Sequence, residues 1–278
     1  MKTPVNLIRR FLSVFAVMTA TVSVTAAVSV TTAVSAMPET AIAETLSLNS
    51  AINKAGRQRM LSQRMAKAYY QIGLNTRRDE ATKALEQSVQ LFDAQLDELS
   101  EFSPTRGISE GLATVKAKWT PFKAIVTRPY NREGAVQLVE LNEELLKATH
   151  RVVVQLQEYS GRATGRLVNI AGRERMLSQR LAKFYMLRQA GFHQTEIVEG
   201  MDQVYNEFGG ALAELRTSGQ NTPEINKRLS NVNVQWELLR QSMKDVNKQR
   251  DLSELVVLTT DKILQEMDAV TGLYEMTQ

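Results

Sequence analysis

The chain has 278 residues, of which 43% are hydrophobic and 23% charged, as in an ordinary globular protein. It contains no cysteine, which excludes disulfides, thiol nucleophiles and cysteine-ligated metals. Its two histidines, His150 and His193, are too few for a typical metal site or a catalytic triad. The formal net charge of +4 is spread along the chain without a run of Lys and Arg, so we expect no nucleic-acid partner.

The N-terminal segment has the pattern of a secretory signal peptide. A short basic stretch precedes an apolar stretch without charged residues, and "AIA" follows, ending at Ala43. We expect a signal peptide over residues 1–43 that is cleaved after Ala43; cleavage after Ala36 and an uncleaved membrane anchor are the alternatives. No later segment approaches about eighteen consecutive apolar residues, so we expect the mature chain to be soluble and periplasmic.

The remainder of the chain is predicted to be entirely helical. Apolar residues recur at spacings of three and four, and the alternation typical of strands is absent. Thr222 followed by Pro223 is a typical helix start. Polar, glycine and proline clusters mark six turns, at Asn75–Asp79, "SPTRG" from Ser103, "TRPYN" from Thr127, Gly191–Gln194, "TSGQNTP" from Thr217 and Asn247–Asp251.

The chain contains an internal repeat. "INKAGRQRMLSQRMAKAYY" begins at residue 52, and the similar "VNIAGRERMLSQRLAKFYM" begins 116 positions later, at residue 168. Apolar residues downstream match at nearly the same offset, so the repeat extends over residues 44–161 and 162–278. Each half contains four predicted helices joined by short turns. We therefore expect an all-α fold of two tandem antiparallel four-helix bundles.

The connection between the halves allows two arrangements. Residues 131–190 contain no proline, and a continuous helix of about 60 residues and about 90 Å would join the bundles end to end. A break at "SGRATG" would instead let the bundles lie side by side. Because each glycine costs a helix only about 1 kcal/mol relative to alanine, we expect the continuous helix.

The repeated segment has two distinct faces when it is drawn as a helix. One face is apolar and includes Leu61 and Met65, as a bundle core requires. The opposite face consists of small residues and one arginine, which predicts close contact with a second helix from the other half or from another chain. In the two copies this face contains Ala55, Gly56, Arg59, Ser62 and Ala66, and Ala171, Gly172, Arg175, Ser178 and Ala182.

An arginine on a closely packed face needs a counter-charge, because an unpaired buried charge is costly. For Arg59 and Arg175, two explanations are equally open. A carboxylate of a neighbouring helix could pair with them, for which Glu140, Glu143, Glu144 and Glu158 are candidates. A bound planar anion such as nitrate, nitrite or a carboxylate would also match the fork of guanidinium donors. The other arginines of the segment, Arg57, Arg64, Arg173 and Arg180, are expected to be solvated, and Met60 and Met176 to be packing residues.

The two segments "INKAGRQRMLSQRMA" and "VNIAGRERMLSQRLA" resemble the signature of the PilJ-type sensory domain, the N-terminal domain of type IV pili methyl-accepting chemotaxis transducers. That domain is related to the periplasmic domain of nitrate/nitrite sensor kinases, in which the glycine and the arginine of two such helices from a homodimer hold one nitrate. The resemblance implies ligand-binding roles for Gly56, Arg59, Gly172 and Arg175. Possible secondary ligand contacts are Asn53, Arg57, Ser62, Asn169, Arg173 and Ser178.

Arg57 and Arg173 depart from the resemblance, because the nitrate sensors have a small residue directly after the glycine. Two functions follow as hypotheses. The first is an exported module that binds a small anion, within one chain or across a homodimer, and reports to a membrane sensor. The second is a helical scaffold of the cell envelope without a small-molecule ligand. The motif offers no general base, nucleophile or metal cluster, so we expect neither an enzyme nor a cofactor.

Overall fold

The computed structural model of the protein describes residues 46–244 and 251–276, so the expected signal peptide and its cleavage site at Ala43 lie outside the described residues. Within these ranges the chain forms helices joined by turns and contains no strand, as the sequence predicts. The helices are α1 (Leu48–Gly73), α2 (Arg78–Phe102), α3 (Arg106–Val126), α4 (Arg132–Ser160), α5 (Ala163–Gln189), α6 (Thr195–Arg216), α7 (Pro223–Lys244) and α8 (Ser253–Met276).

Side-chain caps explain where several helices begin. The Ser47 hydroxyl accepts a hydrogen bond from the Ser50 amide before α1, and the Asn131 side chain accepts one from the Gly134 amide at 2.8 Å before α4. Thr222 caps α7 in the same way and precedes Pro223, as predicted. Five of the predicted turns therefore lie between helices of the structure, while the sixth, at 247–251, falls mostly outside the described residues.

The two halves have equivalent cores. In the first half, α1 packs against α2 and α4, and α3 packs against α4. In the second half, α5 packs against α6 and α8, and α7 packs against α8. Phe92 stacks on Trp119 with 4.1 Å between the ring centroids, and Phe208 stacks on Trp236 at the same separation. The predicted pair of tandem four-helix bundles is confirmed.

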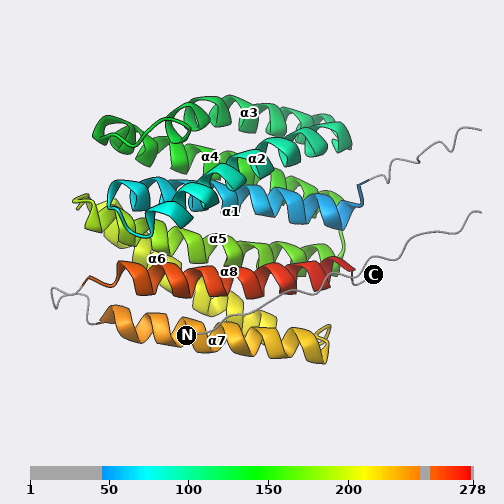
Figure 1. The fold of residues 1–278 in the computed structure, drawn as a ribbon. Coiled ribbons are helices and arrows are strands. Elements are labelled where there is room, and N and C mark those ends of the chain that lie inside the picture. The colour runs from blue at the N-terminus through cyan, green and yellow to red at the C-terminus, as the bar shows by residue number, and fades with distance from the viewer. Residues whose placement is uncertain (1–45, 245–250, 277–278) are drawn as a thin grey trace, which may run out of the picture. The chain divides into compact units, whose positions relative to one another are not determined.

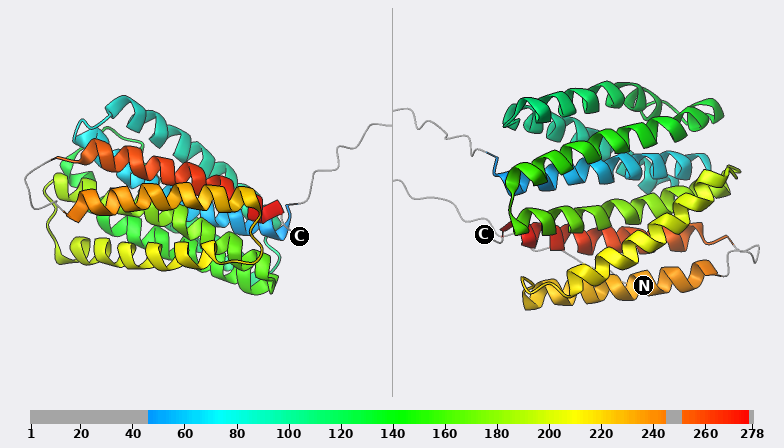
Figure 2. Two further views of the ribbon diagram at one scale, coloured as in Figure 1. Left: turned by 90° about the horizontal axis from the view of Figure 1, so that it is seen from below. Right: turned by 180° about the vertical axis from the view of Figure 1, so that it is seen from behind.

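The expected continuous helix is wrong. Helix α4 ends at Ser160, and Gly161 adopts the left-handed conformation with φ of 59° before α5 begins at Ala163. Glycine reaches this conformation without steric cost, so the chain reverses here. The alternative, a break at "SGRATG", is the one observed, and the two bundles lie side by side (Figure 2).

The repeated helices α1 and α5 form the centre of the molecule. They run in the same direction next to each other, while α3 and α7 lie at opposite outer edges (Figure 1). The small-residue face of α1 thus meets a second helix within the same chain. Buried lysines also join the halves: Lys67 of α1 donates to Asp261 of α8 at 2.6 Å, and Lys183 of α5 donates to Glu143 of α4 at 2.7 Å.

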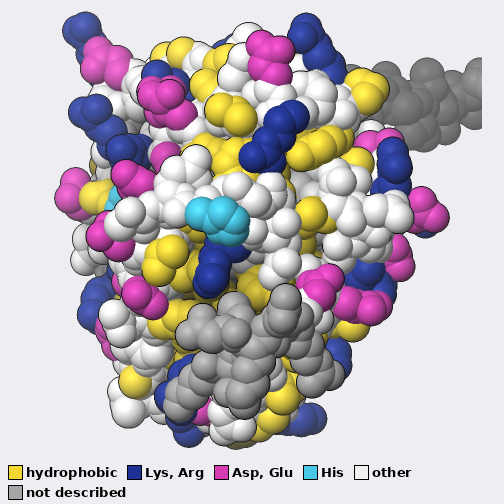
Figure 3. All heavy atoms as spheres, turned by 90° about the vertical axis from the view of Figure 1, so that its left-hand side faces the viewer, with side chains coloured by type: hydrophobic (Ala, Val, Ile, Leu, Met, Phe, Trp, Pro, Cys, Tyr) yellow, Lys and Arg dark blue, Asp and Glu magenta, His cyan; other side chains and the backbone are white. Residues whose placement is uncertain are grey.

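Positive and negative side chains are mixed on one face of the molecule. On the face drawn in Figure 3, Lys and Arg side chains are interspersed with Asp and Glu. Within the described residues, no helix combines the length and the apolar character that are needed to cross a membrane.

Candidate functional site

Helices α1 and α5 approach each other closely where the two motif glycines face each other. A Cβ atom placed on Gly56 would lie 3.9 Å from the Cα atom of Gly172, and the same distance separates a Cβ on Gly172 from the Cα of Gly56. The same Cβ on Gly56 would lie 3.5 Å from Nη2 of both Arg59 and Arg175. The structure therefore brings together all four residues that the resemblance implies for ligand binding.

Each motif arginine reaches across to the facing helix. Arg59 Nη2 donates to Asn169 Oδ1 at 2.8 Å and to the Asn169 carbonyl oxygen at 3.3 Å. Arg175 Nη2 makes the reciprocal contacts with Asn53, at 2.7 Å to Oδ1 and 3.3 Å to the carbonyl oxygen. Both arginine side chains are fully buried. The two motifs thus form a pseudo-symmetric pair, in which the arginine of one copy is bound to the asparagine of the other.

The last helix of each half completes the site, but with different residues. Nη1 of Arg175 donates to Asp268 of α8, which also accepts a bond from Arg57. Nη1 of Arg59 lies 3.1 Å from His150 Nδ1 of α4, and Arg59 has no carboxylate partner within the described part of the chain. Of the two buried motif guanidinium groups, only that of Arg175 therefore has a carboxylate partner among the described residues, and the charge of Arg59 is not compensated by an ion pair.

The two motif arginines also differ in their pKa values. Burial and the charges of Arg175 and Arg173 lower the pKa of Arg59 to about 9. Burial lowers the pKa of Arg175 to about 10, a smaller change, because the Asp268 carboxylate opposes it. Burial alone would raise the pKa of Asp268, but Arg175 and Arg57 hold it below its usual value. The carboxylate is therefore ionised at neutral pH and compensates Arg175 rather than Arg59.

The carboxylates proposed as partners of the motif arginines are not the ones observed. Glu143 instead contacts Lys183 and Arg180, and Glu144 contacts Lys118. The expectation of solvated flanking arginines holds for Arg173, whose side chain is 44% exposed and pairs with Glu207. It needs correction for Arg57 and Arg180, which are only 24% and 16% exposed and pair with Asp268 and Glu143. Sequence periodicity could not locate these partners, because they belong to other helices.

The other predicted secondary contacts divide into two groups. Asn53 and Asn169 bind the arginines directly. Ser62 and Ser178 are fully buried but turn back onto their own helices, where each hydroxyl donates at 2.8 Å to the carbonyl oxygen of the arginine three residues earlier. These serines position the arginine-bearing turns and do not point their hydroxyl protons at the guanidinium groups.

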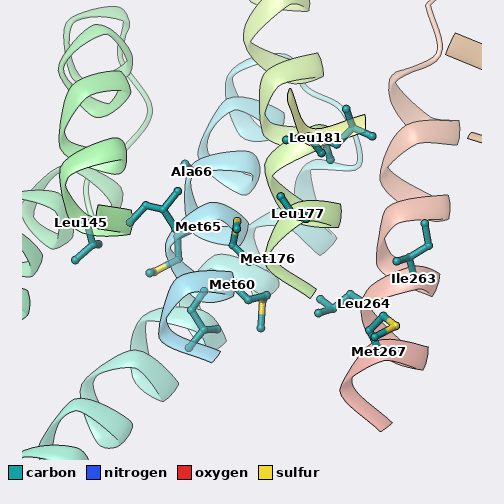
Figure 4. Close-up of a cluster of buried hydrophobic side chains, with 14 of the residues drawn as sticks. Met60, Met65, Ala66, Leu145, Met176, Leu177, Leu181, Ile263, Leu264 and Met267 are labelled. Carbon is teal, nitrogen blue, oxygen red and sulfur yellow. The ribbon is translucent and has the colours of Figure 1, made fainter. Parts of the chain in front are cut away.

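The methionines that follow the motif arginines belong to an apolar cluster. Met60 of α1 and Met176 of α5 lie next to each other in a cluster with Leu177 and Met267, as Figure 4 shows. Both methionines are buried packing residues, as expected.

Sequence reasoning missed His150, Asp268 and the two residues that bind the asparagines. Gln157 of α4 accepts from Asn169, and Glu275 of α8 accepts from Asn53. His150 is exposed, yet its ring contacts Arg59. The repeat was an incomplete signal, since the offset of 117 that aligns Leu138 with Leu255 places His150 opposite Met267, one residue before Asp268.

Comparison with known proteins identifies the family. The family model described as "Type IV pili methyl-accepting chemotaxis transducer N-term" matches residues 41–128 and 159–270, which together exceed half of the chain. The protein is thus a sensory-type helical module with two copies of one domain. It belongs to the PilJ family of chemotaxis-transducer N-terminal domains. No curated protein and no solved structure matches the chain.

Proposed function

We propose that the protein is an exported sensory module that binds one small planar anion between α1 and α5 and reports the bound state to a membrane partner. The observation that carries the proposal is the pair of buried guanidinium groups at the facing glycines, of which Arg175 alone has a carboxylate partner among the described residues. A monoanion would compensate the remaining charge and would accept hydrogen bonds from both arginines. The family, named for chemotaxis transducers, supports the sensory role.

Binding would require the arginine contacts to rearrange. Each Nη2 atom donates to an asparagine side chain, and these oxygens occupy the positions that an anion would take. The glycines provide the room, because any larger side chain would stand within 3.7 Å of both guanidinium groups. An arginine donates a stronger hydrogen bond to a charged oxygen of an anion than to the amide oxygen of an asparagine. This difference in hydrogen-bond strength would favour the anion-bound state.

One observation favours the alternative function, a helical scaffold without a ligand. The reciprocal bonds between Arg59 and Asn169 and between Arg175 and Asn53 already join the halves. In that case the motif is a packing device of the envelope protein, and anions have no specific effect. No group of three or more His, Asp or Glu residues that could hold a metal occurs in the described ranges, and we propose no catalytic role.

Thermal unfolding in the presence of anions separates the two functions. Under the proposal, nitrate, nitrite or acetate raises the melting temperature by an amount that grows with concentration; a hundredfold excess over Kd stabilises by about 2.7 kcal/mol. Arg59→Gln and Arg175→Gln each abolish the rise. Arg64→Gln, on the flank of α1, is the matched control and retains it.

The scaffold predicts a different result. If no anion of this panel shifts the wild-type melting temperature, and both arginine variants lose the same stability with and without anion, then the arginines are structural and the binding proposal is wrong. Sulfate controls for general salt effects, because a divalent tetrahedral ion does not match a planar monoanion site. Reporting to a partner is tested by sedimentation with membranes of the source cells, which the bound anion is expected to change.

A further inference from the structure

The two halves differ at one position that contacts the arginine pair. His150 of α4 and Asp268 of α8 occupy equivalent places in the repeat, since each lies against Nη1 of the motif arginine of its own half. The same difference extends about two turns further along each helix, where the neutral Gln157 binds Asn169 and the acidic Glu275 binds Asn53. The α8 side of the site is therefore acidic, whereas the α4 side has no carboxylate on either of these two positions.

We propose that the anion reaches the arginine pair from the α4 side and is bound there by Arg59 together with a protonated His150, so that anion binding takes up one proton. This inference rests on the proposed function. It adds the side from which the anion enters the site, a further residue that binds the anion, and the regulation of anion binding by pH.

The side of access follows from charge. On the α8 side a cavity of about 470 Å³ lies between α1, α2 and α8, and both carboxylates, Asp261 and Asp268, and the arginines Arg57 and Arg64 line it. Asp268 already pairs with Arg57 and Arg175, so an anion that entered from this side would have to displace a carboxylate from Arg175. On the α4 side the exposed ring of His150 covers Arg59, whose charge has no carboxylate partner among the described residues. An anion is attracted to that guanidinium and can replace a neutral ring there.

The protonation state of His150 without an anion follows from its hydrogen bond with Arg59. Arg59 can only donate, so His150 Nδ1 accepts at 3.1 Å and must be unprotonated. The charged groups that act on His150 are Arg59 of α1, Arg173 of α5 and Glu207 of α6. Partial burial and the two arginines lower the pKa of His150, which Glu207 only partly opposes. Without an anion the imidazole is neutral at pH 7.

An anion between Arg59 and His150 reverses this preference. It separates the guanidinium from the ring and offers the ring an acceptor, so the imidazolium becomes a second charge-assisted donor. The coupling is reciprocal: the anion raises the pKa of His150, and protonation of His150 raises the affinity for the anion. Affinity is therefore expected to increase as the pH falls through the range in which the bound-state histidine titrates.

Calorimetric titration of the full chain with sodium nitrate and with sodium acetate tests the inference. We expect Kd to be about tenfold lower near pH 5.5 than near pH 7.5. Buffers of different ionisation enthalpy should reveal the uptake of about one proton. His150→Asn retains an uncharged acceptor near the position of Nδ1 and is expected to bind with a pH-independent Kd. His150→Asp places a carboxylate on Arg59, equivalent to Asp268 on Arg175, and is expected to abolish binding.

NMR titration of His150 provides a second test that is independent of calorimetry. The chain has two histidines, so His193→Gln leaves His150 as the single imidazole for NMR titration. Its pKa should increase when nitrate is added and remain unchanged in the Arg59→Gln variant. A wild-type Kd that is independent of pH, or a His150→Asn variant that keeps the pH dependence, overturns this inference and leaves the proposed function standing. If the wild type binds neither anion at either pH, the proposed function itself is wrong.

Discussion

At the scale of single residues, Glu174 of α5 is a buried acid without a partner. Its side chain is fully buried, and neither carboxyl oxygen has a hydrogen-bond partner in the described part of the chain. Burial raises the pKa of Glu174 well above its ordinary value, and Arg173 only partly opposes this. The equivalent residue of the first half is Gln58, whose amide donates to the Phe92 carbonyl oxygen at 2.9 Å. We infer that Glu174 is protonated in the folded state.

Replacing Glu174 by Gln should stabilise the protein, and more so at high pH. Because the folded-state pKa of Glu174 lies above its unfolded value, the folded state binds more protons, and the wild type loses stability as the pH rises above about 4.5. The amide removes this loss. Chemical unfolding should show a gain of about 1–3 kcal/mol at pH 8 and a smaller gain at pH 5.

The repeat provides the reciprocal control for this prediction. Gln58→Glu introduces the same acid into the first half, where it should lower stability with the same dependence on pH. A Glu174→Gln variant with wild-type stability at pH 8 would show that the carboxylate is ionised and solvated in the folded protein, contrary to its burial.

At the scale of helices, the crossing of α1 and α5 determines whether an anion fits. A methyl group on Gly56 would meet both Nη2 atoms at 3.5 Å, which is an ordinary contact distance. The helices can therefore accept alanine here without separating, and alanine favours a helix over glycine by about 1 kcal/mol. The methyl group would nevertheless occupy the space between the two guanidinium groups.

Gly56→Ala should therefore separate stability from binding. We expect the free energy of unfolding to remain unchanged or to rise by up to about 1 kcal/mol, while the anion-dependent rise in melting temperature disappears. Gly209→Ala is the matched control, because a Cβ at that helical position would meet nothing within 4 Å. It should gain the same stability and keep the anion response.

Two outcomes would contradict the role assigned to this glycine. A large loss of stability in Gly56→Ala would mean that the glycine serves helix packing. An unchanged anion response in the same variant would place the anion elsewhere. Gly172→Ala is expected to be less stable than Gly56→Ala, because its Cβ would lie 3.2 Å from Arg175 Nη2 and the arginine would have to move.

At the scale of the whole molecule, the two halves depend on each other. Helix α1 buries the small-residue face of its motif on α5, and Lys67 and Lys183 each extend to the last helix of the other half. A separated first half would expose Arg59, Gly56 and Lys67 to water. Because α5 repeats the motif of α1, a second copy of the first half offers nearly the same complementary surface.

A fragment of residues 46–161 is therefore expected to form a homodimer through α1. In this dimer two Arg59 side chains would face two His150 side chains, and Asp268 would be missing. The association should be weak without an anion and stronger with nitrate, particularly at low pH. Sedimentation equilibrium measures this directly. A fragment that stays monomeric and is as stable as the full chain would show that the bundles fold independently.

Much of this architecture can be predicted from the sequence because it depends on local periodicity. Leucine spacing, caps such as Thr222 and the turn residues defined the helices and five turns between described helices. The repeat of N-x-A-G-x-x-R predicted a face that packs closely on another helix. The resemblance to the PilJ-type signature also indicated Gly56, Arg59, Gly172 and Arg175 as one group.

The tertiary structure decided how the halves meet and which charges are compensated. Helix α4 ends at Ser160, and the chain reversal at Gly161 lets α1 pack along α5. The free energy of burying this contact depends on tertiary structure, so the helix penalty of about 1 kcal/mol for a glycine could not predict where α4 ends. The equivalence of His150 and Asp268 also became clear only in the structure. The sequence match of the fourth helices pairs Leu138 with Leu255, 117 positions apart, whereas His150 and Asp268 are 118 positions apart. Charge pairing depends on distances across helices, and a one-dimensional pattern contains no such distances.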